Sequence, residues 1–228
     1  MRRKAIVAWS SGKDSAFALY ETLREGAYDV AGIMTTVTPA FGRISVHGVR
    51  RELLAQQAAC LGLASTEVSI PYPCPNAAYE SAMAGAFAAA RDELGVSHVI
   101  FGDLYLADIR AYRERQMSAV GLTPVFPLWM RDTRALAHAM FAAKFEAQVV
   151  AVDAARLDAS FAGRAFDAQL LHDLPAGIDP CGENGEFHTF VTAAPIFARR
   201  VSVRAGGVVL RDGAYYADLL SSKITAHS

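Results

Sequence analysis

The 228-residue chain has few cysteines, almost no net charge and no long hydrophobic run. Its three cysteines, Cys60, Cys74 and Cys181, share no CxxC spacing, which argues against a disulfide framework and against a structural zinc site. A formal net charge of −1 gives no electrostatic basis for a strong nucleic-acid or acidic-membrane partner. No segment approaches the ~20 apolar residues of a membrane span, and the apolar stretch near the N-terminus is too short for a signal peptide. We therefore expect a soluble, cytoplasmic protein without membrane contacts.

What the chain does have is a regular alternation of short apolar runs and longer helical patterns. Strands are predicted at residues 5–9, 29–37, 66–70, 97–101, 124–128 and 147–152. Helices are predicted between them at residues 14–24, 50–63, 77–94, 108–120 and 133–143. The strands are almost continuously apolar, as expected when helices cover both faces of a parallel sheet. The alternation predicts an α/β fold, a Rossmann-like doubly wound parallel sheet.

The alternation ends after about residue 153. A helical patch at residues 166–174 is followed by β-like pieces at residues 196–203, 208–211 and 214–217. This pattern predicts a smaller C-terminal α+β portion. We place a nucleotide-binding domain at residues 1–130 and a substrate-binding portion at residues 131–228, although no Pro/Gly/Ser-rich linker marks the boundary.

The segment "SSGKDS", residues 10–15, joins the first predicted strand to the first predicted helix. Ligands of open parallel sheets bind at the carboxyl ends of the strands, and the first amides of a helix attract anions. A phosphate therefore fits this position. An ordinary capped helix without a ligand fits the same residues, and the segment lacks the GxxxxGK[ST] spacing of the common phosphate loop. The candidate phosphate ligands are Ser10, Ser11, Gly12, Lys13 and Ser15.

Two aspartates at the ends of predicted strands are candidates for Mg²⁺. Asp14 would repel a bare phosphate, so its position is explained either by capping the helix or by facing a bound Mg²⁺. Asp103 follows the fourth predicted strand, beside the first, where a nucleotide would lie. Gly102 permits close approach of the backbone there. A simple turn after the strand explains Asp103 equally well.

The second informative segment is "DPCGENGEFHTFV", residues 179–191. Its glycines and Asn184 indicate a tight, irregular turn. Glu183, Glu186 and His188 could orient a nucleophile or accept its proton. By residue type alone, a solvated surface turn that leads into a strand explains the same pattern.

Both segments resemble motifs of one enzyme family. "SSGKDS" resembles the SGGxDS loop of the N-type ATP pyrophosphatases, with Ser11 where that pattern usually has glycine. "GENGEFHT" resembles the signature of the diphthine–ammonia ligase family, a subgroup of those enzymes, and the likeness extends from about residue 4 to residue 219. The resemblance, which is strongest to a bacterial branch, implies ATP and Mg²⁺ as cofactors. It also implies cleavage of ATP between the α- and β-phosphates, with Lys13, Asp14, Glu183, Glu186 and His188 as catalytic residues.

Further candidates surround the expected nucleotide. Met34 and Thr35 end the second predicted strand, where an adenine edge could meet backbone groups, and His47 either contacts the nucleotide or starts a helix. Arg110, Arg113 and Arg115 share one predicted helix and could bind pyrophosphate or an anionic substrate. A solvated basic helix face explains the arginines equally well. Asn184 and Glu186 are further candidates for substrate binding.

The first functional hypothesis is an ATP-dependent ligase that adenylates a substrate carboxylate and transfers ammonia to it. The carboxylate belongs to a small molecule or to a protein side chain. The alternatives are an ATP- or AMP-binding sensor without turnover and a tRNA-modifying relative, although the net charge argues against the latter. The charged loop around Glu186 favours the enzyme over the sensor. The resemblance also implies a homodimer.

Overall fold

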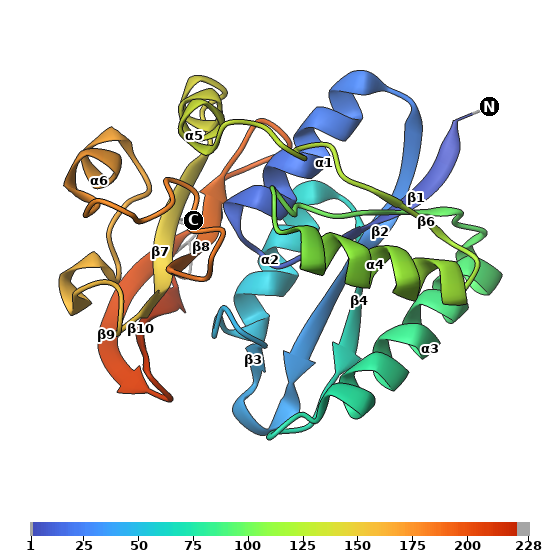
Figure 1. Cartoon of the computed structure of the whole chain (residues 1–228), viewed down its shortest axis with the longest axis horizontal. Helices are drawn as coiled ribbons and strands as arrows, with labels where there is room; N and C mark the ends of the chain where they lie inside the picture. The colour runs from blue at the N-terminus through green and yellow to red at the C-terminus, as the bar shows by residue number, and fades with distance from the viewer. Residues whose placement is uncertain (1, 223–228) are drawn as a thin grey trace, which may run out of the picture.

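The computed structural model describes residues 2–222, which form two sheets covered by helices (Figure 1). The strands of the first sheet are β1 (Arg3–Ala8), β2 (Tyr28–Thr38), β3 (Arg43–Ile44), β4 (Ala64–Ser69), β5 (His98–Ile100) and β6 (Thr123–Val125). The order is β3-β2-β1-β5-β6, with β4 also paired to β2. All pairs are parallel except β2 with β3. This confirms the predicted Rossmann-like α/β fold.

Helices cover both faces of this sheet because side chains alternate along its strands. The helices are α1 (Lys13–Glu25), α2 (Arg51–Leu61), α3 (Asn76–Leu94) and α4 (Ala107–Ala119), and the short 3-10 helix η1 spans Pro39–Phe41. In β1, Val7 belongs to the core that contains Phe17 of α1 and Leu53 of α2. Its neighbour Ile6 belongs to the core that contains Phe87 of α3. The period of two thus separates the two cores.

The C-terminal portion is built on an antiparallel sheet of order β8-β7-β10-β9. Its elements are α5 (Thr133–Ala142), β7 (Glu146–Asp153), η2 (Ala159–Phe161), α6 (Ala168–Asp173), β8 (Phe187–Ala193), β9 (Val203–Arg211) and β10 (Ala214–Ser221). The strand predicted at residues 147–152 is present, but it belongs to this second sheet. The strand predicted at residues 196–203 is wrong, because residues 194–202 form an irregular segment. Ile196 and Phe197 instead pack on the core from that segment.

The two portions pack on each other through one continuous core. The rings of Phe17 in α1 and Phe145 beside β7 meet edge to face, with centroids 5.2 Å apart. At the other end of the contact, Arg43 and Arg50 both bind the carboxylate of Asp218 in β10, at 2.9 and 2.6 Å. Within residues 2–222, no helix is long and apolar enough to cross a bilayer.

Candidate active site

The SSGKDS segment leaves β1 and enters α1 as a compact loop held by its own hydroxyl groups. The Gly12 amide donates to Ser10 Oγ at 3.3 Å, and the two hydroxyls of Ser10 and Ser15 lie 3.1 Å apart. The Ser15 hydroxyl also donates to the Gly12 carbonyl at 3.1 Å. Ser11 adopts a positive φ of 71°, a region that favours glycine. The segment therefore needs support from outside to keep this conformation.

That support comes from strand β8 of the C-terminal portion. The Val191 amide donates to the Ser11 carbonyl at 3.0 Å. The Lys13 amide donates to Thr189 Oγ1 at 3.1 Å. A Cβ added to Gly12 would lie 2.8 Å from the His47 ring and 3.1 Å from the Thr189 carbonyl, so only glycine fits between these neighbours. The loop is thus clamped along one side by a strand that lies about 180 residues further along the chain.

Lys13 is buried and faces the C-terminal portion. Its ammonium donates to Asp14 Oδ2 at 2.9 Å and to the Cys181 carbonyl. It also lies over the rings of Phe166 and Phe187, 5.2 and 5.3 Å from their centroids. These contacts neutralise a charge that would otherwise be unpaired in the interior. The predicted role of Lys13 as a phosphate ligand stays a prediction, and in this geometry the side chain instead fixes the carboxylate of Asp14.

Three carboxylates gather where the ends of β1 and β5 meet. Gly102 makes this approach possible, because a Cβ there would lie 2.7 Å from the backbone of Asp14 and Ser15. Burial raises the pKa of Asp14 and the pKa of Asp103. Burial, together with the charges of Asp14 and Asp103, raises the pKa of Glu183 to about 7. Lys13 beside Asp14, at 2.9 Å, and Arg113 beside Asp103, at 3.7 Å, offset part of the negative charge of this cluster.

The donor set of this cluster fits Mg²⁺. Asp14 Oδ1 and Asp103 Oδ2 are buried oxygens without a hydrogen-bond partner among the described residues. Mg²⁺ in nucleotide sites is commonly held by one or two carboxylates together with phosphate oxygens and water. In the part of the chain that the structure describes, no three or more His, Cys, Asp or Glu side chains are arranged so that together they could hold a metal ion. A site of this kind would be completed by a substrate.

The two glutamates of the 179–191 segment have different environments. Glu186 is fully buried and accepts from the Asp179 amide at 3.2 Å and from the Asn184 amide and side chain, both at 2.9 Å. Glu183 reaches across to the loop after β5, where Oε1 accepts from the Leu104 amide at 2.7 Å. Glu186 therefore braces its own loop, and only Glu183 joins the carboxylate cluster. The structure engages Asn184 as a partner of Glu186.

His47 and His188 form a pair beside the SSGKDS segment. Their ring centroids lie 4.7 Å apart, and His47 Nδ1 lies 3.0 Å from the Thr189 carbonyl. Burial lowers the pKa of both rings, for His188 to about 4. Because a carbonyl can only accept, Nδ1 of His47 is assigned as its protonated nitrogen. Both imidazoles are thus neutral near pH 7.

A cavity of about 220 Å³ opens at the carboxyl ends of β1, β2 and β5, and we call it the strand-end cavity. The predicted residues Ser10, Met34, His47 and Arg113 line it. Thr35 is buried beside it but is not part of its lining. This is the position at which open α/β sheets bind their ligands. The remaining lining residues are Ala8, Trp9, Thr36, Ile44, Ser45, Val46, Tyr79, Met83 and Phe101.

Comparison with models of known protein families identifies the family of this chain. Residues 3–124 match the family model described as diphthamide synthase N-terminal domain, and residues 132–216 match the diphthamide synthase C-terminal domain. The chain belongs to the diphthamide synthase family. Two similar curated relatives are named diphthine–ammonia ligase. The human protein is 29% identical over 118 residues, covering 49% of this chain and 44% of the relative. The Danio rerio protein is 29% identical over 133 residues, covering 56% and 52%. The matched part of the chain thus spans about half the length of these relatives.

The three arginines of α4 do not form one anion site in this member of the diphthamide synthase family. Arg113 lines the strand-end cavity, with Nε 3.7 Å from Asp103 Oδ2. The guanidinium of Arg110 instead lies against the rings of Phe126 and Trp129, 4.8 and 4.7 Å from their centroids. It also binds Glu114 at 2.8 Å. Only Arg113 is therefore positioned beside the strand ends.

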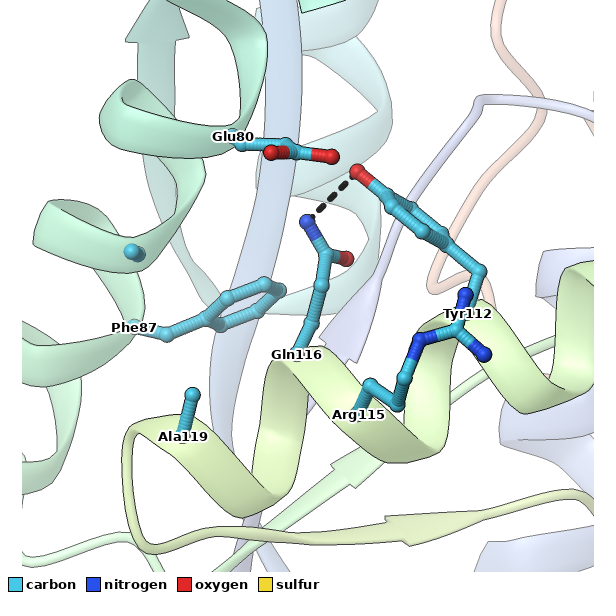
Figure 2. Close-up of a pocket in the computed structure, with 7 residues that line it drawn as sticks. Glu80, Phe87, Tyr112, Arg115, Gln116 and Ala119 are labelled. Atoms are coloured by element: carbon cyan, nitrogen blue, oxygen red, sulfur yellow. Dashed lines mark hydrogen bonds between the residues drawn. The ribbon is translucent and has the colours of Figure 1, made fainter. Parts of the chain in front are cut away.

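Arg115 lines a separate cavity of about 310 Å³ between α3 and α4 (Figure 2). Figure 2 shows this cavity with Phe87 on the α3 side and Gln116 bonded to the Tyr112 hydroxyl, at 2.7 Å. Residues at positions 113 and 115 point to different sides of a helix, because successive residues turn by about 100°. Arg110 and Arg113, three positions apart, share a helix face, and the role of the three arginines in binding pyrophosphate or an anionic substrate stays a prediction.

Several lining residues of the strand-end cavity were not predicted from the sequence, among them two of α3. Tyr79 and Met83 of α3 lie four positions apart and so share one helix face. Their spacing in the alanine-rich segment was the available signal. The sequence pattern does not say which side of the sheet this helix face covers. That depends on the direction in which the β4-α3-β5 connection crosses the sheet.

Proposed function

We propose that this member of the diphthamide synthase family is an ATP-dependent ligase that activates a carboxylate and transfers ammonia to it. The observation that carries the proposal is the gathering of Asp14, Asp103 and Glu183 beside the start of α1, next to the strand-end cavity. A site for a triphosphate needs a cation and helix amides, and this arrangement supplies both kinds of contact.

ATP would bind with its adenosine in the strand-end cavity and its phosphates against the SSGKDS segment. The apolar lining of Met34, Met83 and Phe101 suits a purine ring. Arg113 and the start of α1 would hold phosphate oxygens, since both carry positive potential. Asp14 and Asp103 would hold Mg²⁺, which when bound neutralises the charge that develops on the phosphates.

The reaction has two steps. An oxygen of the substrate carboxylate attacks the α-phosphorus, the bond from that phosphorus to the bridging oxygen breaks, and pyrophosphate leaves. Ammonia then attacks the acyl carbon of the adenylate, and AMP leaves with the electron pair of the broken C–O bond. The attacking nitrogen must lose a proton, and we assign its acceptance to Glu183, whose carboxylate is held beside Asp14 and Asp103 by the Leu104 amide.

The reaction class is taken from the relatives, whose name couples diphthine with ammonia. For this chain we propose ammonia as the nucleophile and a carboxylate of a small molecule or a protein side chain as the acceptor. Glu186 and Lys13 would hold the geometry of the site, because both are buried. Lys13 binds the carboxylate of Asp14, and Glu186 binds Asn184 in the loop that carries Glu183. His188 stays a predicted catalytic residue, and the homodimer stays a prediction.

The test is to incubate the purified chain with ATP, Mg²⁺, ammonium chloride and a pool of cell metabolites or protein, and then to separate the nucleotide products. The proposal expects AMP and pyrophosphate in equal amounts, formed only when an acceptor is present. ADP with phosphate would contradict cleavage between the α- and β-phosphates. Binding of ATP without consumption in every acceptor pool would favour a nucleotide sensor.

A further inference from the structure

Gln57 is a fully buried polar side chain on the core-facing side of α2, directly behind the SSGKDS segment. Its Oε1 accepts from the indole N–H of Trp9 at 3.0 Å. Its Nε2 donates to the carbonyls of Ser11, at 3.1 Å, and Val191, at 2.7 Å. Since an indole N–H only donates and carbonyls only accept, the orientation of the amide is fixed by its neighbours. The side chain uses its acceptor and both donors, and it joins β1, the loop and β8.

The contact with Ser11 controls the direction of one peptide plane. The Ser11 carbonyl receives two donors, Gln57 Nε2 and the Val191 amide. In a trans peptide the carbonyl and the following N–H point to opposite sides. With the Ser11 carbonyl held toward Gln57, the Gly12 N–H points away from it, and it does donate to Ser10 Oγ. Ser10 lines the strand-end cavity, so this N–H lies on the side where the phosphates are proposed to bind.

Ser11 makes this support necessary. Its φ of 71° lies in the left-handed region, which glycine adopts freely and serine adopts with strain. If the peptide rotated, the Ser11 carbonyl would face the phosphates and repel them. A strained conformation persists only where surrounding contacts enforce it. Here those contacts are the two donors to the Ser11 carbonyl.

We propose that Gln57 is a positioning residue that locks the Ser11–Gly12 peptide in the orientation that accepts the phosphates of ATP. The proposal rests on the proposed function in one respect, that the SSGKDS segment binds phosphates. It predicts that loss of Gln57 weakens phosphate binding and that a glycine at position 11 restores part of the lost affinity.

The experiment measures the affinity of the full chain for Mg·ATP and for adenosine by titration calorimetry. Gln57→Leu is expected to weaken Mg·ATP binding about tenfold, because two buried carbonyls lose a donor and the peptide is released. Adenosine affinity should change less than about twofold, since adenosine lacks the phosphates that the Ser11–Gly12 peptide is proposed to receive. The double variant S11G/Q57L should recover at least about half of the lost affinity on a logarithmic scale, since glycine needs no enforcement.

Two further variants keep the test decisive. Gln57→Glu preserves the side-chain shape and the acceptor for Trp9 but places a carboxylate against two carbonyls, so its Mg·ATP affinity should also fall. This variant keeps the proposal testable if Gln57→Leu does not fold. Gln56→Leu is the matched control, because this neighbour is bonded elsewhere, to Ser221 Oγ at 2.7 Å. It should bind Mg·ATP like the unmodified chain.

Equal affinity of the unmodified chain and both Gln57 variants for Mg·ATP would overturn the proposal. An equal loss for ATP and adenosine, or no recovery by the Ser11→Gly change, would also overturn it, because general destabilisation would then explain the result. Failure of the unmodified chain to bind Mg·ATP at all would instead contradict the proposed function.

Discussion

The N-terminal and C-terminal portions of the molecule contribute different things to the same site. The first sheet presents the ends of β1 and β5, with the carboxylates of Asp14 and Asp103 and the start of α1. The second sheet supplies β8, whose Thr189 and Val191 hold the SSGKDS segment from behind. The proposed reactive groups thus come mainly from the first portion, and the contacts that hold the SSGKDS segment come from the second. The first sheet therefore does not fix the conformation of the SSGKDS segment by itself.

The buried polar groups make this division clear. Lys13 is in the N-terminal portion by sequence, but besides Asp14 its ammonium contacts three residues of the C-terminal portion, Cys181, Phe166 and Phe187. Glu183 shows the reverse arrangement, because it belongs to the C-terminal portion and joins the carboxylates of the first. The comparison predicts that some substitutions remove chemistry and others remove positioning, and the following changes separate the two.

The largest effect is expected from Asp14→Asn. The change keeps the size of the side chain but removes a charge from the proposed magnesium site and from the partner of Lys13. We expect AMP formation to fall by about 10³-fold or more, as for loss of a group that stabilises transition-state charge. The measurement is the rate of AMP and pyrophosphate release. Asp108→Asn, an exposed position in the first turn of α4, is the control and should be fully active.

Glu183→Gln should lower turnover by about 10²-fold, because a glutamine can keep the bond from the Leu104 amide but cannot accept a proton. Its thermal midpoint should stay close to that of the unmodified chain. Glu186→Gln should do the opposite, with a lower midpoint, because Glu186 is buried and receives three donors from its own loop. Equal activity losses at unchanged stability for both variants would contradict the distinction between the two glutamates.

A pH titration of stability tests the burial of His188. Its folded pKa of about 4 lies below the ordinary value of 6.5, so below pH 6.5 the unfolded chain binds a proton that the folded chain does not. The free energy of unfolding should therefore fall as the pH drops from 7 to 4. We expect about 2 kcal/mol from this group, less than the full shift implies, because the ring is only partly buried. Denaturant unfolding of the unmodified chain and of His188→Gln measures the difference, and parallel pH profiles would contradict it.

The smallest effect is expected at the clamp between Asp218 and its two arginines. Asp218→Asn removes the charge that binds Arg43 and Arg50, and all three side chains are partly exposed. We expect a loss of about 1 kcal/mol in the free energy of unfolding, smaller at high salt. Asp212→Asn, in the turn between β9 and β10, provides a comparison at an exposed position. A loss of turnover in Asp218→Asn at unchanged stability would give the clamp a role in the site.

The same contrast explains what the sequence could predict. Alternating strands and helices up to residue 125 have local signals, such as the apolar run of β1 and the turn residues after it, and the parallel sheet was predicted correctly. Strand β8 was expected only under the interpretation of residues 179–191 as a surface turn that leads into a strand, because the glycines at 182 and 185 and the charges at 183 and 186 dominate that segment. Its pairing with β7 could not be predicted from the local pattern.

The positioning residues of the site were harder to predict than the reactive ones. Asp14 and Glu183 stand in motifs, whereas the importance of Gln57 depends on contacts with Trp9, Ser11 and Val191, which are distant in sequence. A glutamine on the apolar face of α2 was the only local sign. Lys13 shows that a motif position does not fix the contacts of a side chain. Its position in the motif predicts a phosphate ligand, whereas in the structure its ammonium contacts the Asp14 carboxylate and two aromatic rings.

The central claim is that β8 holds the conformation of the SSGKDS segment. Its most direct test compares two threonines of that strand. Thr189 accepts from the Lys13 amide, and Thr192 donates to the Glu146 carbonyl within its own sheet. Both are almost fully buried, so valine should cost each a similar amount of stability. The affinity for Mg·ATP should fall about tenfold in Thr189→Val and stay within about twofold in Thr192→Val. Equal affinities for the two variants would contradict the account.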